Sequence, residues 1–248
     1  MNLKVAATGS SGNCYILNDG EHRLVLDAGI PYKVFLRAVE FNIQNISGCL
    51  VSHEHMDHAQ AVPDMIASGI SVHMSRGTMD KVFKASDSLR SLVQVHKASD
   101  IFEVGEWTVR GFYLHHDAAE PLGFLIKSKD VKMVYLTDSA SCDYTFSNLT
   151  HIIIECNYIL DILNKKAERG HLTGSLSNRI KGNHMGLETL IPWLVSLDRS
   201  KLEKVVLVHL SDSNSNAEMM IREIEKKIGV EVVMAEPGQT INLSAVGF

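Results

Sequence analysis

His53-Glu54-His55-Met56-Asp57-His58 places four potential metal ligands within six residues. The segment follows the apolar run Cys49-Leu50-Val51 and precedes a stretch with a helical pattern, so we expect a loop at the end of a buried strand. Its donors are imidazole nitrogens and a carboxylate oxygen, which suit zinc, manganese or iron better than a thiolate-selecting site. Without a cation, these polar groups would be crowded together at a considerable desolvation cost. The spacing therefore predicts a metal site rather than a solvated loop.

Short apolar runs on both sides of this motif predict an α/β protein with two groups of strands. We expect strands at residues 3–8, 14–17, 23–27, 48–52, 70–74, 93–95, 101–104, 107–114, 123–127, 133–136, 152–154, 205–210, 230–234 and 239–243. Helical patterns cover residues 31–40, 59–68, 78–85, 157–168, 186–197 and 217–227. This order favours two stacked sheets with helices on their outer faces, in a single domain over residues 1–248. Strict βαβ alternation and a GxGxxG turn are missing from the sequence, which argues against a dinucleotide-binding fold.

Composition limits the kinds of partner. The 248 residues include 24 Lys and Arg against 29 Asp and Glu, a formal charge of −5, so bulk basicity cannot hold nucleic acid. A local basic stretch, Lys165 to Lys181, is either a phosphate contact or an ordinary solvated helix face. No apolar run reaches the roughly 18 to 20 residues that span a bilayer, so we expect no membrane segment and a cytoplasmic protein. The four cysteines are scattered, which favours reduced thiols.

The motif resembles that of the metallo-β-lactamase superfamily, in which HxHxDH follows a strand of a four-layer αββα sandwich. The resemblance implies further ligands, and His116, Asp138 and His209 each lie at or just beyond the end of a predicted strand. His115 competes with His116. Strand alternation favours His116, because it falls on the same face as Phe112 and Leu114.

With these residues, the resemblance implies two divalent ions, Zn²⁺ or Mn²⁺ with iron as a further choice. His53, His55 and His116 would hold one ion, Asp57, His58 and His209 the other, and Asp138 would be shared. Two ions about 3.5 to 4 Å apart can hold a bridging hydroxide near neutral pH, which would be the nucleophile of a hydrolase. Asp57 is accordingly expected to be catalytic as well as a ligand.

Three further segments resemble the YycJ/WalJ-type branch, which lies near tRNase Z and the carbon–phosphorus-lyase cyclic phosphodiesterase. They are Gly9-Ser10-Ser11-Gly12-Asn13-Cys14, residues 116–123, and Ile153-Ile154-Glu155-Cys156-Asn157 after Asp138. The resemblance implies a nuclease that cleaves phosphodiester bonds, a 5′-to-3′ exonuclease with DNA favoured over RNA as substrate.

His184 matches a histidine that is not a metal ligand in the phosphodiesterase branches. There it contacts the scissile phosphate or protonates the leaving oxygen, and Glu155 matches a carboxylate that orients it. Met185-Gly186 replaces the usual Ser or Thr. The competing interpretation is a surface histidine that caps a helix. His171 could also approach a substrate.

Several other functions fit the same residues. One is hydrolysis of small cyclic phosphodiesters, or of thioesters or lactones, on the same scaffold. Two more are a mononuclear iron oxidoreductase and a binding protein without activity. The interval from Asp138 to His209 is too short for a β-CASP domain, and no long tRNA-gripping arm is obvious. A large nucleic acid would therefore be held by a modest surface, by a homodimer or by a partner protein.

Overall fold

The computed structural model describes residues 1–211 and 213–243. Two compact units are distinguished by their internal contacts. Unit 1 contains Met1–Tyr113, Ala118–Val131 and the described residues from Ala235 onward, and unit 2 contains Leu114–Asp117 and Lys132–Met234. The single domain that the sequence predicts over residues 1–248 stays a prediction.

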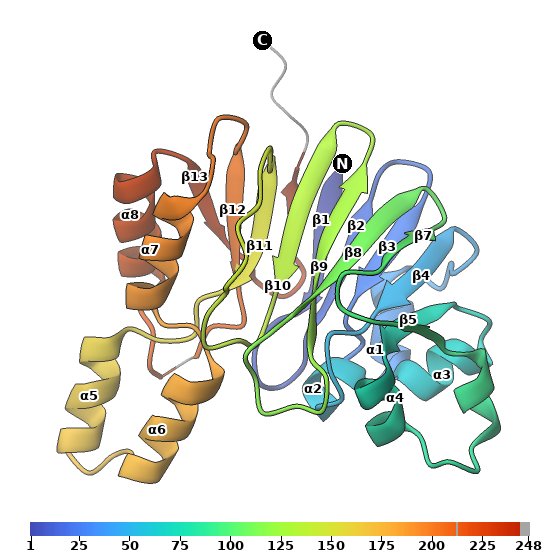
Figure 1. Ribbon diagram of the computed structural model, residues 1–248, viewed down its shortest axis with the longest axis horizontal. Coiled ribbons are helices and arrows are strands. Elements are labelled where there is room, and N and C mark those ends of the chain that lie inside the picture. Colours follow the sequence, from blue (N-terminus) through green and yellow to red (C-terminus); the bar gives the residue numbers. More distant parts are fainter. Residues whose placement is uncertain (212, 244–248) are drawn as a thin grey trace. The chain divides into compact units, whose positions relative to one another are not determined.

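Unit 1 contains a seven-stranded sheet with the strand order β14-β1-β2-β3-β4-β5-β6 (Figure 1). Strands β14, β1, β2 and β3 pair antiparallel, whereas β3 to β6 pair parallel. The bounds are β1 (Asn2–Ala7), β2 (Cys14–Asn18), β3 (Arg23–Leu26), β4 (Ile46–Leu50), β5 (Val72–Ser75), β6 (Gln94–His96) and β14 (Thr240–Asn242). The carboxyl ends of the parallel strands β3 and β4 therefore lie next to each other.

Short helices cover one face of this sheet. They are α1 (Tyr32–Ala38), α2 (Met56–Ala59), α3 (Val62–Ala67) and α4 (Arg76–Val82), followed by a 3₁₀ turn, η1 (Ser88–Leu92). Phe35, Met65 and Met79 from α1, α3 and α4 join Val25 and Val72 of the strands in one buried apolar cluster. Unit 1 also contains three antiparallel strands, β7 (Ile101–Val104), β8 (Trp107–Tyr113) and β9 (Leu122–Ser128).

Unit 2 is built on four parallel strands in the order β13-β12-β11-β10. The strands are β10 (Val131–Leu136), β11 (His151–Glu155), β12 (Lys204–Val208) and β13 (Glu231–Met234). Ile152, Ile153 and Ile154 are all fully buried, as expected for a parallel strand covered on both faces. The helices are α5 (Leu160–Glu168), α6 (Gly174–Asn183), α7 (Leu187–Ser196) and α8 (Ala217–Ile228). Helices α7 and α8 lie beside each other next to β12 and β13, and α5 pairs with α6 (Figure 1).

Two sequence-based expectations need correction. The helix expected at residues 59–68 is two helices, and α2 begins at Met56, so Asp57 and His58 belong to a helical turn rather than to the loop before it. Helix α6 was not expected at all, because its sequence contains two glycines together with serines and asparagines of low helix propensity. Across the described residues, the search for a helix long and apolar enough to cross a bilayer found none.

Candidate metal centre

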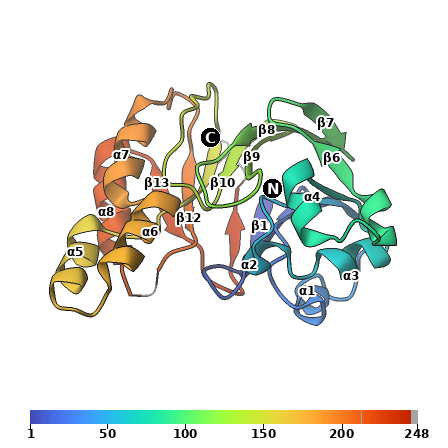
Figure 2. The same cartoon turned by 60° about the horizontal axis from the view of Figure 1, so that its bottom comes forward.

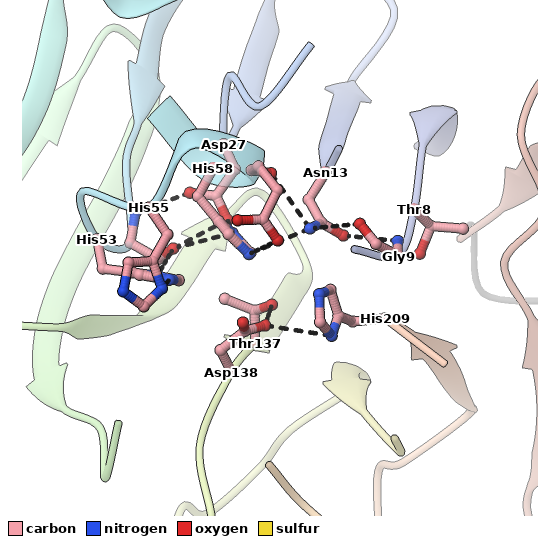
Figure 3. Close-up of polar contacts among 12 residues, drawn as sticks. Thr8, Gly9, Asn13, Asp27, His53, His55, His58, Thr137, Asp138 and His209 are labelled. Atoms are coloured by element: carbon pink, nitrogen blue, oxygen red, sulfur yellow. Dashed lines mark hydrogen bonds and ion pairs between the residues drawn. The ribbon is translucent and has the colours of Figure 1, made fainter. Parts of the chain in front are cut away.

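The motif of unit 1 begins directly after β4 and brings imidazole nitrogens together. His53 is fully buried, and its Nε2 lies 3.1 Å from Nδ1 of His55 (Figure 3). Nδ1 of His53 lies 3.0 Å from Oγ of Ser52. Nε2 of His53 and Nδ1 of His55 therefore face each other, an arrangement in which both nitrogens can bind one cation.

His58 is oriented by Asp27, a residue that the sequence analysis did not single out. Its Nδ1 lies 2.8 Å from Oδ2 of Asp27, and both side chains are fully buried. Asp27 also accepts hydrogen bonds from the backbone N–H of Ser52 at 2.7 Å and from its hydroxyl at 3.0 Å. Because the carboxylate accepts, Nδ1 of His58 carries the hydrogen and Nε2 is left as the ligand nitrogen. The signal that could have identified Asp27 is a carboxylate directly after the strand that pairs with β4.

The loop between β1 and β2 fixes the backbone of the motif. The backbone N–H of Asn13 donates to the carbonyl of Asp57 at 2.8 Å, and Nδ2 of Asn13 lies 3.1 Å from Nε2 of His58. Asn13 is held in turn by Gly9, whose N–H donates to Oδ1 at 2.9 Å (Figure 3). Gly29 must lack a side chain, because a Cβ would lie 1.7 Å from the carbonyl oxygen of Asp57. The Gly/Ser/Asn segment thus positions the helical turn that carries Asp57.

In unit 2, three of the sequence-predicted ligands lie close together. Oδ2 of Asp138 lies 3.7 Å from Nε2 of His116, and Oδ1 lies 3.4 Å from Nδ1 of His209 (Figure 3 shows the latter pair). All three side chains are only 2 to 3% exposed. The structure therefore gathers His116, Asp138 and His209 into one buried polar cluster within this unit.

The environments of His115 and His116 differ as strand alternation predicts. His115 has a 52% exposed side chain and pairs with Asp143 at 2.6 Å. His116 is buried and donates from Nδ1 to the carbonyl of Asn183 at 2.9 Å. Burial lowers the pKa of His116, against the opposing charge of Asp138, so its ring is neutral near pH 7. A neutral imidazole with Nε2 left over is the form that binds a metal ion.

Glu155 lies at the centre of a second set of contacts in unit 2. Its fully buried carboxylate accepts from Nδ1 of His184 at 2.6 Å and from Nδ1 of His209 at 2.9 Å. The backbone N–H groups of Ser139 and Met185 donate to its other oxygen at 3.1 Å each. The sequence analysis expected the contact with His184 but missed the one with His209.

The charges of this pair support each other. Burial alone would raise the pKa of Glu155, but the facing His184 holds it below its usual value. Burial alone would lower the pKa of His184, but the Glu155 charge and hydrogen bond raise it above its usual value. A protonated His184 beside an ionised Glu155 is therefore the stable state at neutral pH. The His184 side chain is 21% exposed and remains accessible.

The donor atoms in each unit fit a divalent cation. Ligand atoms of Asp138, Glu155, His184 and His209 all lie within 4.8 Å of one another. The donors are imidazole nitrogens and carboxylate oxygens, and hydrogen bonds fix the tautomers of several of the rings, which suits zinc or manganese. Buried imidazoles and carboxylates directly after strands define a metal-dependent hydrolase as the class of protein.

The sequence matches the family described as "Beta-lactamase superfamily domain" over residues 22–210, so the chain belongs to this superfamily. It is 25% identical over 251 residues to the exodeoxyribonuclease YycJ of Bacillus anthracis, which covers 96% of this chain and 90% of the relative. These matches confirm the resemblance drawn from the sequence motifs.

Two solved structures share the fold. The metallo-β-lactamase fold protein YhfI of Bacillus subtilis has a TM-score of 0.71 at 14% identity, over 97% of this chain and 99% of that chain. Human tRNase Z, short form, has a TM-score of 0.65 at 14% identity, over 99% of this chain and 100% of that chain. The predicted fold class, an α/β metallo-β-lactamase fold, is confirmed, and the chain is a metal-dependent hydrolase.

Proposed function

We propose that the chain is a two-metal phosphodiesterase acting on nucleic acid, a 5′-to-3′ exonuclease with DNA as its favoured substrate. One observation carries the phosphodiester chemistry. His184 is accessible, lies 3.9 Å from Asp138 and is held at 2.6 Å by the buried carboxylate of Glu155. A charged imidazole beside the candidate metal centre can donate a proton to a leaving oxygen. The similarity to an exodeoxyribonuclease supports nucleic acid as the substrate.

The proposed ligands are the seven that the superfamily motif implies. His53, His55 and His116 would hold one ion, Asp57, His58 and His209 the second, and Asp138 both. Zn²⁺ and Mn²⁺ fit these nitrogen and oxygen donors. When bound, such ions supply Lewis-acid activation of water and neutralise charge on phosphoryl oxygens.

The remaining steps belong to side chains of unit 2. Nδ1 of His184 is engaged by Glu155, so the Nε2 proton is the one available to the leaving alkoxide. Glu155 keeps the ring charged before the bond breaks and orients it, because its own oxygens are fixed by two backbone N–H groups. Asp138 lies beside both His116 and His209 and provides negative charge for the cations.

The test is to incubate purified, manganese-loaded protein with end-labelled DNA and RNA, each single- and double-stranded. We expect nucleotides to be released progressively from the 5′ end of DNA, with slower attack on RNA. Asp57→Ala should abolish this turnover while the protein remains folded. Hydrolysis of a lactone or thioester, with no turnover of oligonucleotides or of bis-p-nitrophenyl phosphate, would contradict the proposal and support an ester hydrolase instead.

A further inference from the structure

Helices α5 and α6 and the turn between them, residues 160–183, form a basic element in an acidic chain. We call it the α5–α6 hairpin, and the two helices lie side by side in both views (Figures 1 and 2). It contains five basic residues and two carboxylates, a formal charge of +3 in a chain of −5. The basic residues are Lys165, Lys166, Arg169, Arg179 and Lys181. Charge alone would also fit a solvated helix face, so further contacts must decide.

Helix α6 ends at the candidate metal centre. Its last residue, Asn183, accepts the hydrogen bond from Nδ1 of His116 through its carbonyl oxygen. The next residue, His184, caps the helix, and its backbone N–H donates to the carbonyl of Ile180 at 2.9 Å. The last turn of α6 therefore orients a proposed ligand and carries the proposed proton donor.

One basic side chain of α6 reaches the same place. Nη2 of Arg179 lies 3.3 Å from Oδ2 of Asp117, and the other oxygen of Asp117 lies 3.4 Å from Nε2 of His116. The pair is open to solvent, with 67% of Arg179 and 41% of Asp117 exposed. Such an ion pair contributes little to stability, so the guanidinium can exchange Asp117 for another anion. Its planar fork matches a phosphate, to which it can donate two hydrogen bonds.

The lysines of the hairpin are already engaged by the protein. Lys165 pairs with Asp161 at 2.6 Å, Lys181 donates to Asn164 at 2.8 Å, and Lys166 donates to the carbonyl of Ser213. Arg169 is exposed, and within residues 1–211 and 213–243 its side chain forms no ion pair. The two arginines are therefore the cations of this element that are most available to a ligand.

We propose that the α5–α6 hairpin binds the phosphate backbone of the DNA strand being cleaved. Arg179 contacts the phosphate next to the reacting one, and Arg169 contacts a phosphate farther along. The inference rests on the proposed function and assigns its substrate a binding surface. The ten residues of α6 rise about 15 Å, which corresponds to about four phosphates at 3.4 Å per nucleotide of a helical strand.

The experiment measures binding separately from cleavage. The probe is a fluorescein-labelled single-stranded DNA of phosphorothioate linkages, which keep their charge and resist hydrolysis. Its Kd for the manganese-loaded protein is measured by anisotropy at several salt concentrations. The test variant is Arg169→Gln with Arg179→Gln. The matched control is Lys226→Gln with Lys227→Gln, which removes the same charge from exposed positions of α8.

We expect the test variant to raise Kd on the order of tenfold and to lessen the salt slope by about 1.4, since each lost contact on a single strand contributes about 0.7. The control should keep the wild-type Kd and slope. An RNA of equal length should lose affinity equally, because phosphate contacts carry no sequence or sugar information. An effect confined to RNA would overturn the assignment to DNA.

Two failures remain distinguishable. A wild-type protein that degrades DNA, with a test variant of unchanged Kd and slope, would overturn the hairpin assignment and leave the proposed function intact. A wild-type protein that binds the probe without salt dependence and cleaves no oligonucleotide would overturn both.

Discussion

At the residue scale, the candidate metal centre is characterised by imidazoles with one nitrogen already engaged. Each of these rings makes a hydrogen bond through Nδ1 to an oxygen of the protein, which leaves Nε2 for a cation or substrate. The pairs are His58 with Asp27, His116 with the carbonyl of Asn183, and both His184 and His209 with Glu155. The protein thus selects a tautomer for each ring before any ion binds, so less reorganisation accompanies metal binding.

The first prediction concerns Asp27. Asp27→Ala should lower the metal affinity of the protein about 10- to 100-fold, because Nδ1 of His58 loses the buried carboxylate that fixes its tautomer. Asp27→Asn keeps one acceptor oxygen and should lose less. Competition with a chelator at pH 7 measures the affinity, and circular dichroism checks the fold. Asp130→Ala, an exposed carboxylate in a turn, is the control. Equal affinities in Asp27→Ala and the control would exclude this orienting role.

The second prediction concerns His184. His184→Ala should lower kcat on oligonucleotides by about 10² to 10⁴ without loss of metal, as expected for a general acid. His115→Ala, at the exposed neighbour of a proposed ligand, should keep its turnover. A loss of bound metal in His184→Ala would instead identify His184 as a ligand, together with Asp138, Glu155 and His209.

The same histidine predicts a pH dependence. A general acid is active below its pKa, and Glu155 raises the pKa of His184. Activity should therefore be lost as the pH rises through this raised value. Glu155→Gln removes the charge, so the basic limb of the kcat profile should move to lower pH. A profile in which that limb stays in place would show that another group supplies the proton.

The sequence could predict those site residues whose signal is local. His53 to His58 is a continuous motif, and alternation along one strand separates His116 from His115. Asp27 and the second role of Glu155 were not predictable in this way. Asp27 meets the motif because β3 pairs with β4, and Glu155 meets His209 because β11 pairs with β12. Strand neighbours of this kind are set by the tertiary structure and not by spacing along the chain.

At the scale of elements, strands were easier to predict than helices. Buried parallel strands such as β11 have continuous apolar sequences, which identify them directly. Helix α6 has no such signal. Its interior contains Gly182, Ser177 and Asn178, and it forms because Thr173 caps its first turn, accepting from the N–H of Leu176 at 3.3 Å, and because α5 packs beside it. Tertiary packing overrides the weak propensity here.

The third prediction belongs to strands β5, β6 and β7. Nδ1 of His73 on β5 lies 3.0 Å from Nε2 of His96 on β6, and both rings stack on Phe102 of β7. Burial and the neighbouring His96 lower the pKa of His73 to about 4. Between this value and the ordinary value of about 6.5, the unfolded chain binds a proton that the folded chain refuses. Stability is therefore complete above about pH 6.5 and falls as the pH decreases toward 4.

The loss attributable to His73 should be about 2 kcal/mol by pH 5. Urea unfolding at pH 7 and pH 5 measures it, and His73→Phe should reduce the difference between the two values. Some acid sensitivity should remain in the variant, because burial also lowers the pKa of His151 to about 4. A variant with the full wild-type difference would exclude His73 as its source.

At the scale of the whole molecule, the proposed ligands are distributed over both compact units. Unit 1 supplies His53, His55, Asp57 and His58, and unit 2 supplies His116, Asp138 and His209. The family could be predicted from the sequence because the unit 1 ligands are consecutive. The unit 2 ligands are each separated by tens of residues and could be proposed only through the resemblance.

The last prediction follows from this distribution. A metal that binds the folded chain but not the unfolded one adds about 2.7 kcal/mol at a concentration of 100 Kd. For a chain of this size that amounts to about 5 to 10 °C in Tm, which a chelator should remove in a calorimetric scan.

Variants in either unit then decide which residues hold the ions. If the seven residues act together, Asp57→Ala in unit 1 and His209→Ala in unit 2 should each reduce the bound manganese and shrink the chelator-induced shift. Asp138, Glu155, His184 and His209 could alternatively form a site within unit 2 alone. In that case Asp57→Ala would keep the full metal content and the full shift, and only His209→Ala would lose them. The pair of variants therefore separates a shared two-metal centre from a site confined to unit 2, independently of any assay of turnover.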